Sequence, residues 1–207
     1  MASALNVRSL AADDDGWSSA DLAMERYADG DEAAFETLYD QLAPRLYRFA
    51  LRETRSQSNA EDVVQQTLLQ IHSARSRFVR GAAVLPWAFA IARRLVIDGH
   101  RHAAHQARLE LVRLAGDGDG DGGGDVAIAA ASPEDALDRR RREAELERDL
   151  LALPAAHREA FCLVKLEGLS VIDAAQVLGT TPGNVKIRTH RAAQALRRAD
   201  ARRQETP

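Results

Sequence analysis

The stretch EAFCLVKLEGLSVIDAAQVLGTTPGNVKIRTHRAAQALRR, residues 159–198, decides the fold of the C-terminal part of this 207-residue chain. Gly168 and Gly179 divide it into three helical segments, because glycine adopts the left-handed conformation at helix C-termini at little cost. Ser170, with Asp173 three residues later, is an acidic variant of the capping box and begins the second segment. The pattern therefore predicts a short helix between the two glycines, with one helix before it and another after it.

The third segment begins with Thr181, a helix-capping residue, and Pro182, which suits the first position of a helix. Its expected inward stripe consists of Val185, Thr189, Ala192 and Leu196. A short helix, a glycine turn and a second helix predict a helix-turn-helix, whose second helix enters the DNA major groove. The other faces present Asn184, Lys186, Ile187, Arg188, His190, Arg191 and Gln194 to solvent. Arginine and lysine bond guanine edges or phosphates, and isoleucine contacts a thymine methyl group.

Helical periodicity also dominates the first half, so the whole chain is predicted to be all-α. Pro44 is expected to kink or restart the first long helix. Asn59 with Asp62 is expected to cap the second, and Pro86 to open the third. The expected core faces of these helices comprise Phe35, Leu38, Tyr39, Leu42, Leu46, Phe49, Ala50, Val63, Val64, Thr67, Leu68, Ile71, Trp87, Ala90, Ile91 and Leu95.

A glycine–aspartate stretch separates the two halves. Residues 116–125 hold six of the 13 glycines, a composition that neither buries apolar surface nor supports a helix. The expected organisation is a disordered tail over 1–20, a helical domain over 21–103, a flexible acidic linker over 104–131 and a helix-turn-helix domain over 132–203. Two small helical domains joined by a tether are therefore predicted.

The composition excludes several classes of protein. Apolar residues make up 45% of the chain and charged residues 29%, as in ordinary folded domains. No run of about 18 apolar residues occurs, which excludes a transmembrane helix, and the acidic N-terminus lacks the pattern of a signal peptide. The one cysteine, Cys162, excludes an internal disulfide and a cysteine-cluster zinc site. A cytoplasmic location is expected.

The net charge of −3 hides a segregation of charge along the chain. Acidic residues crowd the first third and the 117–125 stretch, whereas arginines dominate residues 75–113 and 188–203. Two separate basic patches on an acidic chain predict two contacts with anionic partners.

Two groups of motifs occur in a defined order. The first comprises Ala33–Phe35 with Leu38 and Tyr39, Ala60–Thr67, and Pro86–Trp87 with Ile91–Arg93, Ile97 and Asp98. The second comprises Leu153–Phe161, Glu167–Ser170, Ala174–Ala175, Val177–Gly179, and Val185–Lys186 with Arg188 and His190–Ala192. Over roughly residues 20–103 and 132–200, these motifs resemble regions two and four of the extracytoplasmic-function (ECF) sigma factors of bacterial RNA polymerase, a branch of the sigma-70 family.

The resemblance implies a protein that binds core RNA polymerase at the β′ coiled coil and the β flap, directs it to promoter DNA and promotes strand opening. An anti-sigma factor is a further partner common in the family, and neither an enzymatic activity, a cofactor nor a metal is expected. The implied polymerase contacts are Glu61, Asp62, Gln65 and Gln66. The implied contacts with the start-proximal (−10) promoter element are Arg77, Phe78, Arg80, Trp87, Arg93, Arg94 and Arg101. The resemblance also implies that the loop from Phe78 to Leu85 forms a pocket for a flipped base. The implied contacts with the upstream (−35) element are Thr181, Asn184, Lys186, Ile187, Arg188, His190 and Arg191.

Four positions depart from the usual pattern of that family. Gln66 stands where glutamate is common and Arg94 where asparagine is frequent, while Ile187 and Thr189 stand where serine and leucine are common. Because Arg94 and Ile187 lie at or near promoter-reading positions, the promoter preference does not carry over from the resemblance.

Other interpretations of individual motifs remain open at this point. A stand-alone helix-turn-helix regulator needs only the C-terminal domain, and Trp87 suits a helix core as well as a stacking platform. His157, Ser170 and Asp173 form a nominal catalytic triad, but all three suit helix termini. The stretch from residue 117 imitates the start of a calcium loop, yet its twelfth position is Ile128 instead of glutamate.

Overall fold

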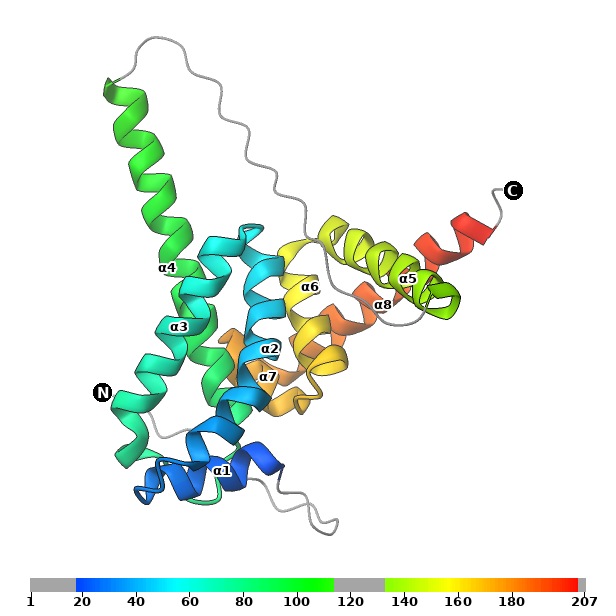
Figure 1. Ribbon diagram of the computed structural model, residues 1–207. Helices are drawn as coiled ribbons and strands as arrows, with labels where there is room; N and C mark the ends of the chain where they lie inside the picture. The colour runs from blue at the N-terminus through cyan, green and yellow to red at the C-terminus, as the bar shows by residue number, and fades with distance from the viewer. Residues whose placement is uncertain (1–17, 114–132, 205–207) are drawn as a thin grey trace. The chain divides into compact units, whose positions relative to one another are not determined.

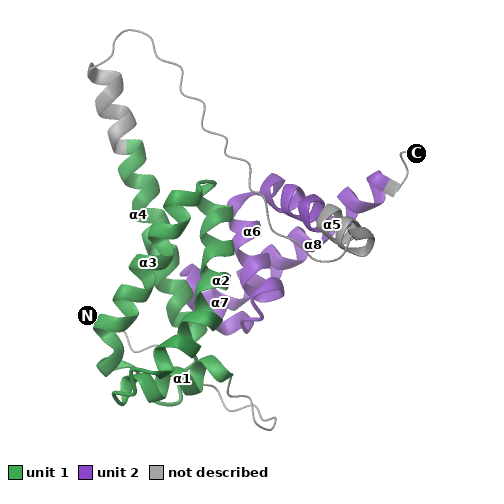
Figure 2. Ribbon diagram, viewed as in Figure 1, with its two compact units in different colours: residues 1–124 green, residues 125–207 purple. Residues whose placement is uncertain are grey.

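The structure, a computed structural model, describes residues 18–113 and 133–204, and every regular element within these ranges is a helix (Figure 1). The chain divides into two compact units, Met1–Gly124 and Asp125–Pro207, coloured separately in Figure 2. The predicted all-α class with two helical domains is confirmed. Within the described ranges, no helix is both long and apolar enough to cross a membrane.

Unit 1 is built around one central helix. Its elements are α1 (Ser19–Ala28), α2 (Ala34–Thr54), α3 (Gln57–Ala74), the short 3₁₀ turn η1 (Arg75–Arg77) and α4 (Val84–Arg113). Helix α2 packs against α1, α3 and α4 (Figure 1), because its buried stripe of Leu38, Leu42, Leu46 and Phe49 repeats at helical spacing. Phe49 meets Phe89 of α4 edge to face, with ring centroids 5.4 Å apart. This core fixes the positions of α1, α3 and α4 around α2.

Three helix boundaries in unit 1 differ from those predicted. Helix α4 begins at Val84, two residues before Pro86, which was expected to open it. Helix α2 continues through Pro44, so the chain does not restart there. Helix α3 begins at Gln57, and Ser56 is its cap, because the Ser56 hydroxyl oxygen accepts from the Asn59 N–H at 3.3 Å. Asn59 with Asp62 is therefore not the cap. Serine at 56 has the same capping chemistry, and the helix simply starts one turn earlier.

The buried face of α4 is also different from the predicted one. Val84, Ala88, Ala92 and Val96 are buried, with Phe89 beside them. The predicted stripe of Trp87, Ala90, Ile91 and Leu95 is only half-buried. Both stripes are apolar and have helical spacing, so packing against α2 and α3 decides between them.

The ends of unit 1 extend into the predicted tail and linker. Ser18 caps α1, which starts at Ser19 within the stretch 1–20. Helix α4 continues to Arg113, within the stretch 104–131. The glycine–aspartate stretch itself lies outside the described residues.

Unit 2 contains the helix-turn-helix. Its elements are α5 (Pro133–Ala152), α6 (Ala155–Phe161), the π-helical turn η2 (Cys162–Leu166), α7 (Val171–Leu178) and α8 (Pro182–Gln204). The helix expected over residues 159–167 is thus split into α6 and a π turn. The core gathers Leu150, Leu153, Cys162 and Ala192, with Phe161, Ala195 and Leu196 packed against it. Near the end of α8, Arg203 pairs with Asp149 of α5 at 2.8 Å.

The predicted helix boundaries of the helix-turn-helix are confirmed. The Ser170 hydroxyl oxygen accepts from the Asp173 N–H at 3.0 Å, and the hydroxyl donates to the Asp173 carboxylate at 2.7 Å. Gly179 ends α7 with φ at +61°, in the left-handed region. The Thr181 hydroxyl oxygen then accepts from the Asn184 N–H at 3.2 Å. Local capping chemistry alone therefore sets the order helix, turn, helix.

Candidate functional surfaces

The outward face of α8 carries most of the residues proposed to contact the upstream promoter element. Asn184, Lys186, His190 and Arg191 are exposed, and Ile187 is 51% exposed. Two further residues are placed differently: Arg188 is half-buried, and the hydroxyl of Thr181 is engaged as the helix cap.

The register of this face is set by the opposite side of α8. Val185, Thr189 and Ala192 are buried against the rest of unit 2, as the predicted inward stripe requires. The Thr189 hydroxyl donates to the backbone carbonyl of Ala160 in α6 at 3.3 Å. The buried hydroxyl of Thr189 thereby has a hydrogen-bond partner. The same bond fixes the rotation of α8 about its own axis relative to α6.

Side-chain hydrogen bonds hold the first turn of α8. The Asn184 side-chain amide donates to the Thr180 hydroxyl oxygen at 3.2 Å. Across the described part of the chain, no acidic side chain pairs with Lys186 or Arg191. Their charges are therefore available to an anion.

A second group of residues surrounds the loop of residues 78–83, which joins η1 to α4. The rings of Phe78 and Trp87 lie against each other, with centroids 5.6 Å apart and planes tilted by 39°. Both side chains are half-buried, so each retains surface that another ring can contact. Arg77 and Arg80, both exposed, flank Phe78 in the sequence. The structure therefore brings Phe78 and Trp87 together, with Arg77 and Arg80 next to them in the chain.

The other three predicted residues lie farther along α4. Arg94 and Arg101 share one face of the helix, where Asp98 sits 3.8 Å from Arg94 and 3.6 Å from Arg101. Both guanidinium groups remain exposed, whereas Arg93 is half-buried. Arg101 lies about 21 Å from Trp87 along the helix axis. These arginines form a separate basic strip beyond the aromatic pair.

The 78–83 loop is held by residues of α1 and its C-cap that the sequence reasoning missed. The backbone N–H of Gly81 donates to Glu25 at 2.8 Å, and that of Val84 donates to Asp21 at 2.7 Å. Asp29 pairs with Arg80. The signals available were the capping-box pattern that begins at Ser18 and the spacing of the three acids every four residues.

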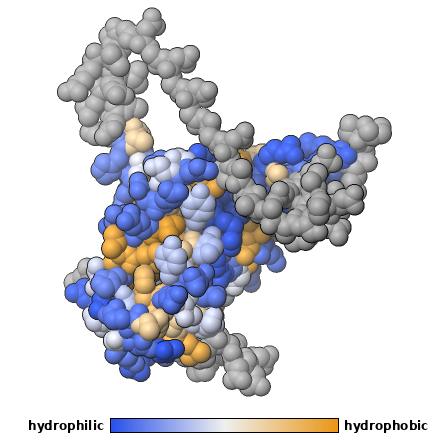
Figure 3. Space-filling view, viewed as in Figure 1, coloured by the Kyte–Doolittle hydropathy of each residue, from blue (hydrophilic) through white to orange (hydrophobic). Residues whose placement is uncertain are grey.

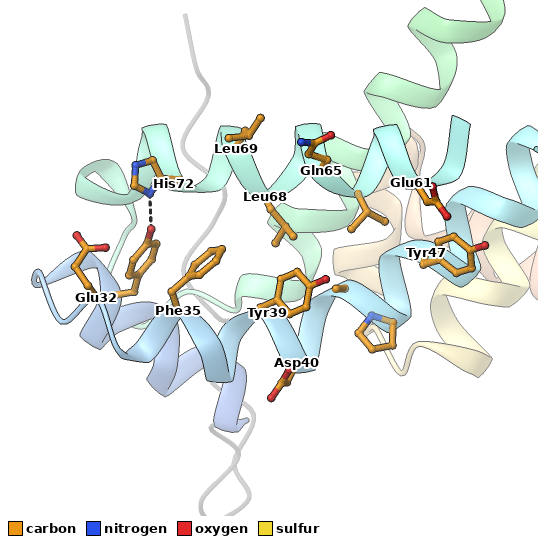
Figure 4. Close-up of a pocket in the computed structure, with 14 residues that line it drawn as sticks. Glu32, Phe35, Tyr39, Asp40, Tyr47, Glu61, Gln65, Leu68, Leu69 and His72 are labelled. Carbon is orange, nitrogen blue, oxygen red and sulfur yellow. Dashed lines mark hydrogen bonds between the residues drawn. The ribbon is translucent and has the colours of Figure 1, made fainter. Parts of the chain in front are cut away.

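A groove of about 970 Å³ runs between α2 and α3 and is called here the α2–α3 groove. It is lined by Tyr27, Glu32, Phe35, Tyr39, Asp40, Ala43, Pro44, Tyr47, Glu61, Val64, Gln65, Leu68, Leu69 and His72. Figure 4 shows Phe35 and Tyr39 rising from α2 and Leu68 descending from α3. Hydrophobic surface is exposed over this part of unit 1 in Figure 3.

The α2–α3 groove corrects one prediction and contains part of another. Tyr39 was expected in the core, yet it is 48% exposed, as is Leu69 at 50%. Of the four residues proposed to contact polymerase, Glu61 and Gln65 line the groove. Asp62 and Gln66 are exposed on the adjacent strip of α3. Periodicity does not distinguish an apolar residue that lines a groove from one in the core, which is why Tyr39 was assigned to the core.

One end of the groove is closed by a polar network. The Tyr27 hydroxyl hydrogen-bonds to Nδ1 of His72, as Figure 4 shows. The Arg75 guanidinium lies 5.3 Å from the centroid of the Tyr27 ring and 3.1 Å from the Glu32 carboxylate. Burial raises the pKa of Tyr27, with a further rise from Glu32 and a smaller opposing effect of Arg75. Arg75 is therefore engaged within unit 1 at the end of the groove, although it begins the arginine-rich segment of the sequence.

The structure bears on the metal alternative and on two residues of the nominal triad in the part of the chain that it describes. There, no three histidine, cysteine, aspartate or glutamate side chains gather in a way that holds a metal ion. Ser170 and Asp173 are engaged with each other in the cap of α7. The calcium-loop imitation from residue 117 lies outside the described residues.

Comparison with known proteins gives two matches in chain order. Residues 38–106 match the family model for Sigma-70 region 2, and residues 137–196 match that for Sigma-70 region 4. The RNA polymerase sigma factor CarQ of Myxococcus xanthus is 34% identical, over 84% of this chain and 93% of that protein. The ECF RNA polymerase sigma factor SigF of Caulobacter vibrioides is 35% identical, over 86% of this chain and 93% of its own length.

Solved structures agree with these matches. The sigma factor RpoE of Bartonella quintana, solved with the anti-sigma factor NepR, is 28% identical with a TM-score of 0.59, over 80% of this chain and 95% of that chain. CnrH, solved with the cytosolic domain of CnrY, has the same fold, with a TM-score of 0.60 at 21% identity, over 92% of this chain and 100% of that one.

A region-two unit followed by a helix-turn-helix unit defines the class of sigma-70 proteins. The chain belongs to this family and, within it, to the ECF sigma factors.

Proposed function

We propose that this sigma factor docks on core RNA polymerase through the α2–α3 groove and the neighbouring strip of α3. The observation that carries the proposal is an exposed apolar groove whose lining includes the carboxylates of Glu32, Asp40 and Glu61. Exposed apolar patches rimmed by polar groups mark interaction sites, and acidic rims select basic partners. The β′ coiled coil, implied as the partner by the family resemblance, suits such a groove if basic side chains flank its apolar contacts.

The proposed polymerase contacts divide into two kinds. Glu61 and Gln65 act within the groove, and Asp62 and Gln66 act on the strip beside it. Carboxylates at the edge of an interface mainly raise the rate of association and exclude wrong partners. The amide groups add directional hydrogen bonds.

The start-proximal promoter element is proposed to contact the 78–83 loop and the basic strip of α4. Phe78 and Trp87 offer ring surface beside the loop, and stacking of one base on such a ring is worth about 1–3 kcal/mol. That gain offsets the few kcal/mol needed to take a base out of the duplex. Arg94 and Arg101 would hold phosphates along the strip.

The upstream element is proposed to receive α8 in its major groove. Lys186 and Arg191 bond guanine edges or phosphates, and the apolar Ile187 meets a thymine methyl group. An isoleucine 51% exposed on a positively charged helix face leaves apolar surface open to a partner, which favours this assignment.

The regulatory partner and the location follow from the same family membership. An anti-sigma factor is proposed as a partner, supported by the likeness to RpoE solved with the anti-sigma factor NepR. The cytoplasm, where core polymerase works, is the proposed location. A stand-alone regulator is not favoured, because the matches include region two as well as the helix-turn-helix.

Reconstituted transcription tests the function. The purified chain is added to bacterial core polymerase on a library of promoter fragments from its own genome. We expect transcripts only from fragments that share two elements at a fixed separation, and none without the chain. Absence of transcripts from every fragment, with a known sigma factor active in parallel, would contradict the proposal.

The docking surface predicts the behaviour of Asp62→Ala. Removing this exposed carboxylate is expected to weaken core polymerase binding about tenfold, equivalent to about 1.4 kcal/mol, with the fold unchanged. Affinity is measured by fluorescence titration of labelled chain with core polymerase. Glu36→Ala is the matched control, because Glu36 is exposed on α2 outside the groove lining. If Asp62→Ala and the control bind core polymerase with equal affinity, Asp62 does not contribute to the interface.

A further inference from the structure

Helix α1 and its C-cap residue Asp29 contact the 78–83 loop and the first residue of α4 through three acidic side chains. Asp21 accepts from the backbone N–H of Val84 at 2.7 Å, and Glu25 accepts from that of Gly81 at 2.8 Å. Asp29 forms an ion pair with Arg80. Their spacing of four residues places them on a single line along α1. The three contacts reach the loop at three points, from Arg80 to the first residue of α4.

The helix that presents these acids is itself firmly held. A full capping box starts it: the Ser18 hydroxyl oxygen accepts from the Asp21 N–H, and the Asp21 carboxylate accepts from the Ser18 N–H, both at 3.2 Å. Met24 and Tyr27 are buried between α1 and the rest of unit 1. Asp21 is only 4% exposed, and its two oxygens accept one backbone N–H each, from Ser18 and Val84. A buried carboxylate satisfied in this way resists displacement.

The loop needs such support because of its backbone. Gly81 has φ at +79°, a backbone conformation that other residues adopt only at an energetic cost. Because glycine lacks a Cβ, it can also adopt many other conformations. Glu25 bonds the N–H of this same residue and so selects one of those alternatives. Arg80 remains exposed, with 71% of its side chain accessible, although it is paired with Asp29. The loop thus has one defined shape and one neutralised charge.

We infer that α1 is the support of the base-reading loop, and that Asp21, Glu25 and Asp29 are positioning residues for promoter opening. The inference rests on the proposed function, in which the 78–83 loop receives an unpaired base. A preformed loop captures the base without first being ordered, which improves binding of the single strand. Asp29 also pairs with Arg80, which weakens the attraction of this arginine for phosphates of any sequence.

Three variants separate positioning from general stability. Glu25→Ala removes the acceptor for the Gly81 N–H, whereas Glu25→Gln retains a side-chain carbonyl that still accepts it. Glu36→Ala again serves as the control on an exposed acid. Each variant is assembled with core polymerase and assayed on the promoter found by reconstitution, as a duplex and as a template already unpaired around the start site.

For Glu25→Ala we expect about a tenfold loss of open complexes on the duplex, equivalent to about 1.4 kcal/mol, and a much smaller loss on the unpaired template. Binding of labelled single strands with each of the four bases at the melted positions should lose its base preference. Glu25→Gln and Glu36→Ala should behave like wild type. A merely structural defect would instead lower activity on both templates and also weaken polymerase binding.

Asp29→Asn gives an independent test that does not depend on the folding of Glu25→Ala, because the Asp29–Arg80 pair is exposed. Release of Arg80 should strengthen binding to single strands of every sequence and steepen the salt dependence by about 0.7 per added phosphate contact. An unchanged salt slope, or an unchanged base preference in Glu25→Ala, would overturn the inference. If the wild-type chain itself starts no transcripts, the proposed function has failed; if it does and the variants match it, only the role of α1 has failed.

Discussion

Thr189 shows how one side chain accounts for a departure from the family pattern. Leucine is common at this position, which faces the interior of unit 2. Here the threonine methyl is buried, and the hydroxyl donates to the carbonyl of Ala160 in the last turn of α6, directly before the π-helical turn. A buried hydroxyl is tolerated only with such a partner. The sequence identified Thr189 as inward-facing, but not the carbonyl that makes threonine suitable.

Tyr27 carries a prediction about pH. Because burial raises its pKa above the ordinary value of 10.0, the folded state favours the neutral phenol. The neutral Tyr27 phenol therefore adds to the free energy of unfolding. This contribution is complete below the pKa that Tyr27 has in the unfolded chain, and it is lost as pH rises through the pKa of Tyr27 in the folded state. The difference between the alkaline absorbance titrations of wild type and Tyr27→Phe should therefore place the ionisation of Tyr27 above 10.0.

The same variant tests the network at the end of the groove. Tyr27→Phe loses the hydrogen bond to His72, which should cost unit 1 about 0.5–1.5 kcal/mol at neutral pH. The loss of stability at alkaline pH should become smaller than in wild type. Tyr47→Phe is the control, since Tyr47 is half-buried at the other end of the groove. An ionisation of Tyr27 at or below the ordinary pKa would contradict the assignment.

At the scale of elements, the helix boundaries of unit 2 were predictable and the faces of α4 were not. Ser170, Gly179 and Thr181 act within one turn of the backbone, so their effect can be read from neighbouring residues. The π turn over Cys162–Leu166 has no such local signal. The π turn is recognised only in the structure, where the Glu167 N–H donates to the carbonyl of Cys162, five residues earlier, at 2.9 Å.

Gly179→Ala tests the turn of the helix-turn-helix. Nothing lies within 4 Å of the position where a Cβ would be added, so the cost comes from the left-handed φ of +61° alone. We expect unit 2 to lose about 1–2 kcal/mol. Gly183→Ala is the control: Gly183 lies in the first turn of α8 without a positive φ, and its added Cβ would meet only the Thr181 hydroxyl at 4.0 Å.

Urea unfolding followed by far-UV circular dichroism measures both variants. Trp87 lies in α4 of unit 1, so its fluorescence, recorded in a Trp17→Phe background, follows that unit separately. Gly179→Ala should shift the dichroism transition and leave the fluorescence midpoint in place, and Gly183→Ala should shift neither downward. Equal destabilisation by the two substitutions would show that the left-handed turn is not what requires glycine.

At the scale of the whole molecule, the two units present surfaces of different character. The α2–α3 groove of unit 1 is apolar with acidic groups, whereas the outward face of α8 in unit 2 is basic. The segregation of charge in the sequence anticipated this difference. An apolar groove with acidic groups suits contact between unit 1 and a basic protein surface, and the basic face of α8 suits contact between unit 2 and DNA. The basic strip of α4 gives unit 1 a proposed DNA contact of its own.

Because DNA and polymerase are proposed to contact different surfaces, substitutions on α8 and on α3 should impair different kinds of binding. Lys186→Ala and Arg191→Ala should weaken holoenzyme binding to a duplex that carries only the upstream element, and each should lower the salt slope by about 1 if it contacts a phosphate. Polymerase affinity should stay unchanged, and Asp62→Ala should show the reverse behaviour. Mobility-shift titrations at several salt concentrations measure the slopes. The control is Arg197→Ala, because Arg197 is an exposed arginine farther along α8. If Arg197→Ala weakens DNA binding as much as Arg191→Ala does, DNA does not bind one specific face of α8.

The sequence by itself determined the helical class, the order of the two units, the turn at Gly179 and the outward residues of α8. Each of these depends on interactions between residues at most a few positions apart. The tertiary structure decided which apolar stripe of α4 is buried, that Tyr39 lines a groove, and that Glu25 holds Gly81 from 56 positions away. Contacts of that kind arise when helices pack, and packing depends on the shapes of several helices at once, which no local pattern records.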